Sequence, residues 1–199
     1  MLAMKSAREI WEHMAPLAAP LLEQAFGRRD LCILATRVAI ETAAYFGVEA
    51  SALPVKAMVY NAAFARHVAN GFAGVDRSRP ATWRDGAWSV GIGFGKPYDD
   101  MPGRWDGHLI AVADGCFADF AIQQAERLQH HICIGTAVIG PYAGEASWQL
   151  IQDETGTVIE YSRVTDNFWR NAPDWKDAVR RRPVVAKLIR AVRETEVHR

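Results

Sequence analysis

Residues 30–47 read DLCILATRVAIETAAYFG, and the rest of the chain is organised around this stretch. Asp30 is a favourable N-cap residue, no Gly or Pro interrupts the run before Gly47, and Gly commonly stands just past a helix end. The stretch therefore predicts one helix. Inside it only Arg37 and Glu41 are charged, four residues apart on one stripe, so we expect most of the helix surface to be buried.

Cys32 falls in the first turn of this predicted helix. Backbone N–H groups in the first turn lack partners within the helix, and the helix dipole is positive there, so both favour a thiolate over a thiol. The position suits a nucleophile. The alternative is an inert core side chain, because cysteine is among the most buried residue types.

The overall composition indicates a single soluble domain. Half of the 199 residues are apolar, enough for one sizeable core, and we expect one domain over residues 1–199. Its parts are a helical segment (5–26), a catalytic-type core (30–164) and a basic C-terminal helix (174–196). The 23 basic and 23 acidic residues balance, so the total charge points neither to nucleic acid nor to an acidic membrane surface.

Cysteine count and hydropathy favour a cytoplasmic location. Cys32, Cys116 and Cys133 are odd in number and lack short-pair spacing, which argues against a disulfide framework and suits a reducing compartment. No run of about 18 uncharged apolar residues occurs, so we expect no membrane span. The sequence leaves the oligomeric state open.

The segment before the cysteine helix has apolar residues at helical spacing, interrupted by Pro16 and Pro20. It predicts either two short helices or one kinked helix. Gln24 lies shortly before Cys32, and a side-chain amide in such a place can donate to an oxyanion. The alternative for Gln24 is an ordinary solvent-exposed glutamine.

Alternation of apolar and polar residues after Gly47 predicts an antiparallel sheet. The expected strands cover 53–60, 88–94, 108–113, 116–119, 132–139, 146–153 and 157–164, and the last two form a hairpin. Residues 61–71 fit either a strand extension or a short helix. Polar loops are expected at 71–86 and 95–107, and Tyr98 and Trp105 of the second loop are candidate substrate-cleft residues leading to His108.

Residues 107–123, GHLIAVADGCFADFAIQ, contain Asp114-Gly115 between two apolar runs, a strong signal for a two-residue type I′ hairpin turn. The turn fixes the register, with Ala113 opposite Cys116. His108 and Asp119 then lie on one face as diagonal neighbours, within reach of each other's side chains.

A carboxylate that accepts from one ring nitrogen of His108 would fix the tautomer and leave the other nitrogen as a base. The alternatives are a half-buried histidine bonded to backbone and an aspartate that starts the next turn. An aspartate inside an apolar hairpin costs free energy unless it is paired, which favours the pairing.

These features together resemble the transglutaminase-like branch of the papain-like cysteine enzymes. The likeness covers about residues 30–124 and consists of Cys32 opening a buried helix, Gly107-His108 before an apolar strand, and Asp119 on the next strand. It implies an α+β fold in which a cysteine-bearing helix packs on an antiparallel sheet. Two features depart from the family: Leu31 and Ile33 flank the cysteine in place of an aromatic residue, and His108-Leu109-Ile110 replaces HxW.

The resemblance and the residues lead to one expected function. A thiol-dependent enzyme would act on an amide, ester or thioester of a peptide, protein or small acyl compound, as a cysteine hydrolase or a transglutaminase-like acyltransferase. Cys32 attacks, His108 moves the proton, Asp119 orients His108, and backbone N–H groups at Cys32 meet the oxyanion. The alternative is a non-catalytic module of the same fold that binds peptides or proteins.

Two further features carry weaker hypotheses. His130, His131, Cys133 and Cys116 are possible zinc ligands, but adjacent histidines point apart and no second pair has ligand spacing, so we expect neither metal nor cofactor. Residues 170–199 hold nine Lys or Arg against four Asp or Glu. This basic helix is typical of a solvated face; an acidic partner is the alternative, and without interleaved aromatic residues nucleic acid is not expected.

Overall fold

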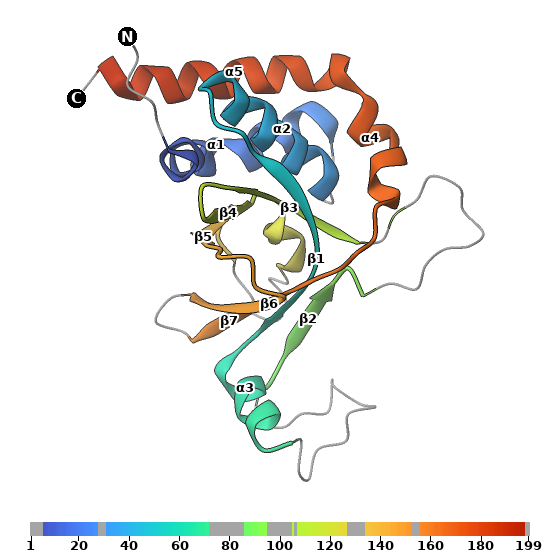
Figure 1. Ribbon diagram of the computed structural model, residues 1–199. Helices are drawn as coiled ribbons and strands as arrows, with labels where there is room; N and C mark the ends of the chain where they lie inside the picture. Colours follow the sequence, from blue (N-terminus) through green and yellow to red (C-terminus); the bar gives the residue numbers. More distant parts are fainter. Residues whose placement is uncertain are drawn as a thin grey trace.

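The computed structural model describes residues 6–27, 31–71, 86–94, 105, 107–126, 134–152 and 156–197. It is a mixed α+β structure in which helices flank an antiparallel, nearly closed seven-stranded sheet (Figure 1). The helices are α1 (Ala7–Phe26), α2 (Cys32–Tyr45), α3 (Ala62–Ala69), α4 (Pro173–Lys176) and α5 (Ala178–Val197), with 3-10 turns η2 (Ile122–Ala125) and η4 (Phe168–Asn171). The strands are β1 (Ser51–Tyr60), β2 (Ser89–Ile92), β3 (His108–Ala113), β4 (Cys116–Asp119), β5 (Val138–Pro141), β6 (Ser147–Gln152) and β7 (Thr157–Arg163).

Helix α1 is one continuous helix, so it resolves the choice between one helix and two. It begins with a capping box: the Ser6 hydroxyl accepts from the Glu9 backbone N–H, and the Glu9 carboxylate accepts from the Ser6 backbone N–H. Pro16 and Pro20 both lie inside the helix. Its buried residues face α2, α5 and the sheet, and Trp11 donates to the Ala39 carbonyl of α2.

Helix α2 confirms the predicted helix but begins differently from the prediction. Its N-cap is the buried Leu31, and no side chain caps the helix, so the prediction of Asp30 as N-cap is wrong; Asp30 itself lies outside the described residues. The apolar cap residue packs into the core, which compensates for the missing polar cap. The helix ends at Tyr45, and Gly47 adopts φ 81°, as expected of a residue just past a helix end.

Strand β1 is the centre of the sheet, whose order is β5-β4-β3-β1-β7-β6. One edge of β1 pairs with β3 over residues 51–55 and with β2 over residues 57–60, while the other edge pairs with β7. The chain between β2 and β3 therefore leaves and rejoins the same edge of β1. Residues 95–104 of this connection lie outside the described part.

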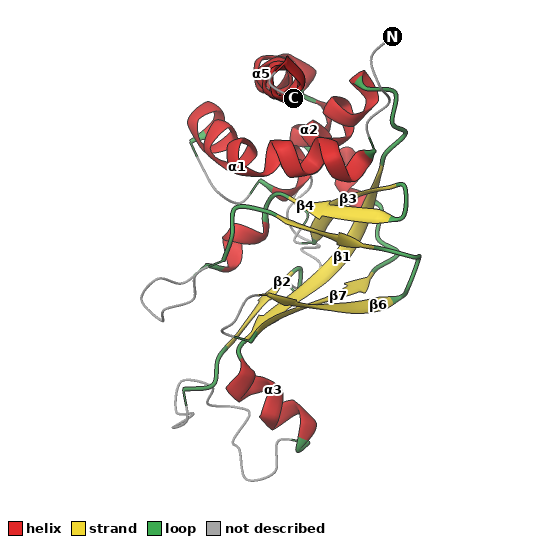
Figure 2. Ribbon diagram, turned by 90° about the vertical axis from the view of Figure 1, so that its left-hand side faces the viewer, coloured by secondary structure: helices red, strands yellow, loops and turns green. Residues whose placement is uncertain are grey.

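The two faces of the sheet have different partners. Helices α1 and α2 cover the face that carries Ala111 and Ala118, and α5 packs on these two helices. Figure 2 shows α1 and α2 beside β3 and β4, with α5 beyond them. The opposite face carries Ile110 and Phe117 and packs within the nearly closed sheet. His108 pairs with Val55 of β1 and belongs to this second face.

Three segments sharpen or correct the sequence expectations. Residues 62–69 form helix α3, capped by the Asn61 side chain, so the strand extension is excluded. Strand β5 begins at Val138, later than the expected 132. The expected C-terminal helix is divided into α4 and α5, because Asp177 leaves helical geometry and its carboxylate accepts from the Arg180 backbone N–H.

The remaining expected strands are confirmed, including the β6–β7 hairpin with Gln152 opposite Thr157. Within the part of the chain that the structure describes, no helix combines the length and hydrophobicity needed to cross a membrane.

Candidate active site

The β3–β4 hairpin has the predicted turn and register. Asp114 and Gly115 adopt φ angles of 50° and 70°, as a type I′ turn requires, and Ala113 pairs with Cys116. Aspartate tolerates a positive φ better than most side chains because it can hydrogen-bond locally. The hairpin thus places residues 108 and 119 near each other on one face.

His108 and Asp119 form a buried hydrogen-bonded pair. The His108 Nε2 group donates to Asp119 Oδ2 at 2.6 Å, and neither side chain is exposed to solvent. The predicted pairing of these residues is confirmed. Because Nε2 is engaged with Asp119, the other ring nitrogen, Nδ1, is the one that can exchange a proton with a substrate or nucleophile.

Asp119 is held by two further donors. The Ala121 backbone N–H donates to Oδ1 at 2.9 Å, and the Tyr161 hydroxyl donates to Oδ2 at 3.0 Å. Burial, followed by the Asp119 charge, raises the pKa of Tyr161 well above 10, so Tyr161 stays a neutral donor. Three donors compensate for the cost of burying the carboxylate.

The charge of Asp119 acts on His108. Burial lowers the pKa of His108, but the Asp119 charge and hydrogen bond, with a smaller contribution from Cys32, outweigh burial and raise it to about 10. The imidazolium is therefore favoured near neutral pH. Such an imidazolium would stabilise a thiolate beside it.

Helix α2 places Cys32 against the start of β3. Thr36, one turn after Cys32 on the same stripe, donates its hydroxyl to the Leu109 carbonyl at 2.7 Å. The Cys32 thiol donates to the Gly107 carbonyl oxygen at 3.7 Å, and it lies close enough to His108 to contribute to the raised pKa of that histidine. The fold therefore brings the Cys32 thiol to the residue before His108, and His108 is bonded to Asp119.

Gly107 marks the place where the two faces of the sheet meet. Cys32 belongs to the helix on one face of the sheet, and the His108 side chain lies on the other face. The two residues come close at the start of β3, where Gly107 lies between them in the fold. A side chain at Gly107 would overlap the Trp105 ring, so this ring lies directly against the glycine. The absence of a side chain there allows the close approach.

Trp105, which the sequence offered as a cleft residue, lies beside the thiol. Its ring packs in a cluster with Cys32, Ile33 and Leu109, and its indole N–H donates to the Asp166 carboxylate at 2.7 Å. The hydrogen bond fixes the ring in place. Tyr98, the other predicted cleft residue, lies outside the described residues.

Gln24 is not brought together with the histidine pair. It lies on the solvent-exposed side of α1, which is the ordinary alternative for this residue. A different glutamine occupies the site: Gln124 of η2 places its Nε2 atom 2.8 Å from His108 Nδ1. The Gln124 carboxamide thus lies next to the ring nitrogen that Asp119 leaves free.

Gly93 brings the end of β2 against the same histidine. It adopts φ 77°, and a Cβ atom there would lie 3.0 Å from the His108 backbone nitrogen and 3.1 Å from the Val55 carbonyl oxygen. Only glycine combines this conformation with this closeness at low cost. The connection between β2 and β3 therefore starts and ends beside His108.

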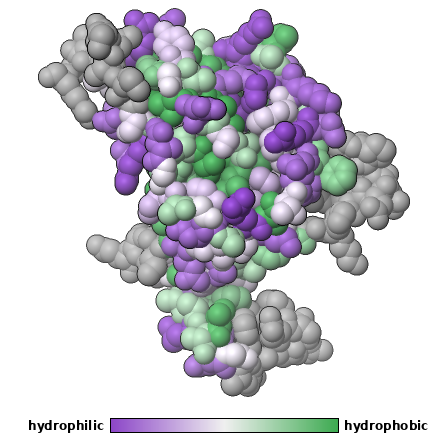
Figure 3. Space-filling view, in the orientation of Figure 1, coloured by the Kyte–Doolittle hydropathy of each residue, from purple (hydrophilic) through white to green (hydrophobic). Residues whose placement is uncertain are grey.

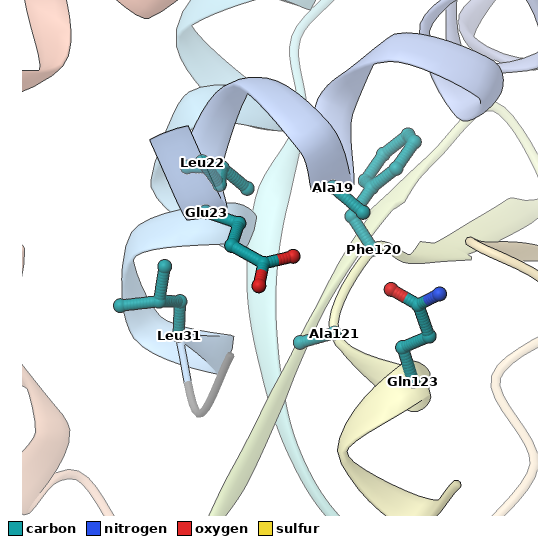
Figure 4. A pocket seen from close by; sticks show the side chains of 7 residues that line it. All are labelled: Ala19, Leu22, Glu23, Leu31, Phe120, Ala121 and Gln123. Carbon is teal, nitrogen blue, oxygen red and sulfur yellow. The ribbon is translucent and has the colours of Figure 1, made fainter. Parts of the chain in front are cut away.

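One small cavity and one larger groove lie outside the His108–Asp119 pair. A cavity of about 20 Å³, the size of one water molecule, separates α1 from the β4–η2 link, and Figure 4 shows Glu23 and Gln123 extending toward it. A larger groove of about 290 Å³ lies between α3 and the sheet. Figure 3 shows apolar residues gathered at this end of the molecule. The groove is lined by Lys56, Met58, Tyr60, Phe64, Val68, Phe94, Glu160 and Ser162.

Of the other candidate ligand and thiol residues, the one that the structure describes, Cys116, does not join the site. Cys116 is buried beside the hairpin turn, and burial raises its pKa to about 11. His130, His131 and Cys133 lie outside the described residues. Among the residues that are described, no group of three or more His, Cys, Asp or Glu is arranged to hold a metal ion.

Sequence reasoning missed Gln124 and Tyr161. Tyr161 had a detectable signal, because it alternates with Ile159 on the inward face of a predicted strand and a buried tyrosine needs a hydrogen-bond partner. Gln124 had no detectable signal in the sequence, since its position depends on the direction in which η2 leaves β4.

Comparisons with family models, curated proteins and solved structures found no match to this chain.

Proposed function

We propose that this protein is a thiol-dependent acyl-transfer enzyme with Cys32 as nucleophile. The observation that carries the proposal is the placement of the Cys32 thiol at Gly107, directly before His108, whose ring is bonded to the buried Asp119. A cysteine-bearing helix packed on an antiparallel sheet also fits the proposed kinship with the papain-like and transglutaminase-like enzymes. The proposed substrates are amides, esters or thioesters of peptides, proteins or small acyl compounds.

The geometry supports a two-stage reaction. With the proton of the Cys32 thiol held on His108 Nδ1, the sulfur forms a bond to the acyl carbon while the carbonyl electron pair moves to oxygen. His108 then returns the proton to the leaving amine, alcohol or thiol as the carbonyl re-forms and the bond to the leaving group breaks. Asp119 keeps the ring oriented and stabilises its positive charge throughout.

The second stage decides between hydrolase and transferase. Water or an amine attacks the acyl-enzyme, His108 takes the proton of the attacking group, and the thiol is regenerated. Residues next to the thiol, such as Trp105, would govern access to the acyl-enzyme. The free thiols of Cys32 and Cys116 fit the proposed cytoplasmic location.

A second candidate function is a non-catalytic module that binds peptides or proteins. The observation that favours it is the groove beside α3, which combines apolar side chains with Lys56 and Glu160. In this reading Cys32 is a core residue and shows no special reactivity. Thiol chemistry therefore separates the two proposals.

The first experiment measures thiol reactivity with iodoacetamide, followed by peptide mapping. We expect Cys32 to be alkylated rapidly at neutral pH and Cys116 slowly, because burial keeps Cys116 protonated. Equal rates at the two cysteines would favour the binding module. This measurement requires no knowledge of the substrate.

The second experiment uses a panel of acyl compounds with purified variants. Cys32→Ala and His108→Ala should each lower kcat by at least about 10⁴-fold, and the double variant should be little worse, because both residues serve one step. Cys116→Ala is the matched control and should retain turnover. An activity that survives Cys32→Ala would show that the thiol mechanism is wrong.

A further inference from the structure

The groove beside α3 lies on the face of the sheet that points away from the core inside the nearly closed strands. Figure 2 shows α3 at the end of the sheet opposite α1 and α2. Met58 of β1 pairs with Gly91 of β2 and with Glu160 of β7, so these three residues form one row across this face. Lys56 stands one row away, opposite Ser162. The groove therefore has a floor of strand residues and a wall made by α3.

The glycine at position 91 lets an aromatic ring pack on this face. A Cβ atom at Gly91 would lie 2.9 Å from the Phe94 ring, so the ring lies directly against the strand. The Lys56 ammonium is placed over the same ring, 5.4 Å from its centroid. Phe94 remains half exposed. This side of the groove thus presents a cation supported by an aromatic ring.

Glu160, the carboxylate that lines the groove, is held by neutral donors. The Tyr60 hydroxyl donates to Glu160 Oε2 at 3.4 Å, and the Gln149 carboxamide donates to the same oxygen at 3.1 Å. Burial, followed by the Glu160 charge, raises the pKa of Tyr60, so the hydroxyl keeps its proton near neutral pH. The two donors fix the carboxylate in place but bring no positive charge to it.

Lys56 and Glu160 carry opposite charges, yet they do not pair with each other. They are diagonal neighbours on adjacent strands, with backbone positions roughly 7–8 Å apart. Within the described part of the chain, the ion pairs include neither residue. Both side chains instead line a groove of about 290 Å³. An apolar groove with a fixed carboxylate and a separate cation is complementary to a ligand that carries both opposite charges.

We propose that this groove is a binding site for a free basic amino acid, arginine in preference to lysine. The guanidinium group of the ligand binds the Glu160 carboxylate, and the ligand's own carboxylate accepts from the Lys56 ammonium. The aliphatic stem between them packs on Met58 and on Val68, which is 47% exposed without a ligand. This inference concerns ligand binding alone and is independent of the proposed acyl transfer.

The size and the aromatic lining of the groove favour one small ligand with a guanidinium group. Its volume is just below the range of about 300–1,000 Å³ that is usual for small-molecule sites. Tyr60, which is bonded to Glu160, and Phe64 both line the groove, with ring centroids 5.3 Å apart. A guanidinium is weakly hydrated and stacks on aromatic rings, whereas an ammonium is strongly hydrated. Arginine therefore loses less hydration in this groove than lysine.

Isothermal titration calorimetry with the wild-type protein compares ligands that differ in one group each. L-Arginine should bind. L-Citrulline, its uncharged isostere, and L-argininamide, which lacks the carboxylate, should each bind about 10-fold more weakly or worse, because each loses one charged contact. L-Lysine should also bind more weakly than L-arginine.

Two variants assign each preference to one side chain. Glu160→Gln should remove the preference for L-arginine over L-citrulline, and Lys56→Met should remove the preference for L-arginine over L-argininamide. Glu194→Gln and Lys187→Met make the same changes at exposed positions of α5 and should leave every dissociation constant unchanged. Thermal unfolding checks that each variant is folded, and L-arginine should raise the Tm of the wild type.

The inference is overturned if L-arginine does not bind the wild type at about 10 mM, beyond the range of weak specific binding. It is also overturned if Glu160→Gln and Lys56→Met weaken all three ligands equally or weaken none. A glycylglycylarginine peptide that binds more tightly than L-arginine would overturn the assignment to a free amino acid. Because binding is measured without turnover, these outcomes leave the proposed role of Cys32 to its own tests.

Discussion

Two buried charges, Asp119 and Arg181, are compensated in opposite ways. Asp119 accepts from His108, Tyr161 and the Ala121 backbone, and this group ends at a ring nitrogen beside a thiol. Arg181 of α5 donates to three backbone carbonyls around α4 and to the Glu41 carboxylate of α2. The partners of Asp119 therefore include the histidine beside the thiol. The partners of Arg181 are all groups of the helices and their connections.

The comparison shows when a buried charge indicates function. Both side chains are almost completely hidden, at 0% and 2% exposure, and both have hydrogen-bond partners. Burial and pairing alone do not separate a catalytic group from a structural one. The two cases are separated by what lies next to the hydrogen-bonded partners. For Asp119 it is a thiol beside His108, and for Arg181 it is the backbone around α4 and the start of α5.

Among the changes that test this comparison, Asp119→Asn is expected to have the largest effect. Asparagine keeps the shape but loses the charge that raises the His108 pKa, so kcat should fall about 10²- to 10⁴-fold yet stay measurable, with the pH optimum displaced as the histidine becomes less basic. Steady-state kinetics across pH measures this. Asp114→Asn, in the exposed turn of the same hairpin, is the control, and an equal loss in both variants would contradict the role of Asp119.

A smaller effect, on stability and not on chemistry, is expected from Arg181→Met. The change leaves buried carbonyls unpaired and should lower the free energy of unfolding by about 2–3 kcal/mol. Glu41 is partly exposed and still bonded to Arg37, which keeps the cost moderate. Urea unfolding measures the loss, and the exposed neighbour variant Arg182→Met should change stability by less than about 0.5 kcal/mol. A fall in kcat per folded molecule would contradict the purely structural role given to Arg181.

Titration of His108 should make stability depend on pH. Its pKa is about 10 in the folded protein against an ordinary value of 6.5, so its contribution to stability is complete below pH 6.5 and is lost as pH rises through 10. Urea unfolding between pH 6 and 9.5 should show this decline in the wild type. His108→Gln should lack this part of the slope, and the neutral Tyr161 adds none below pH 10. Parallel pH profiles in the two proteins would contradict the pairing.

The sequence predicted the hairpin and the His108–Asp119 pair because both depend on local rules. An Asp-Gly turn fixes the register, and the register fixes which side chains share a face. The sequence also predicted α2, the strand periodicity and the thiol at a helix start. It failed at the N-cap of α2, where burial of Leu31 outweighed the preference for a polar cap residue.

The sequence by itself therefore determined an α+β chain with a cysteine helix and a histidine–aspartate hairpin. Only the tertiary structure decided which residues surround them: Tyr161 reaches Asp119 from a strand 42 residues away, and Arg181 reaches Glu41 across 140 residues. It also placed Gln124, and not Gln24, beside His108. Local periodicity indicates the face of a helix or strand on which a side chain lies. Long-range contacts depend on how whole helices and strands pack together, and no local sequence pattern predicts that packing.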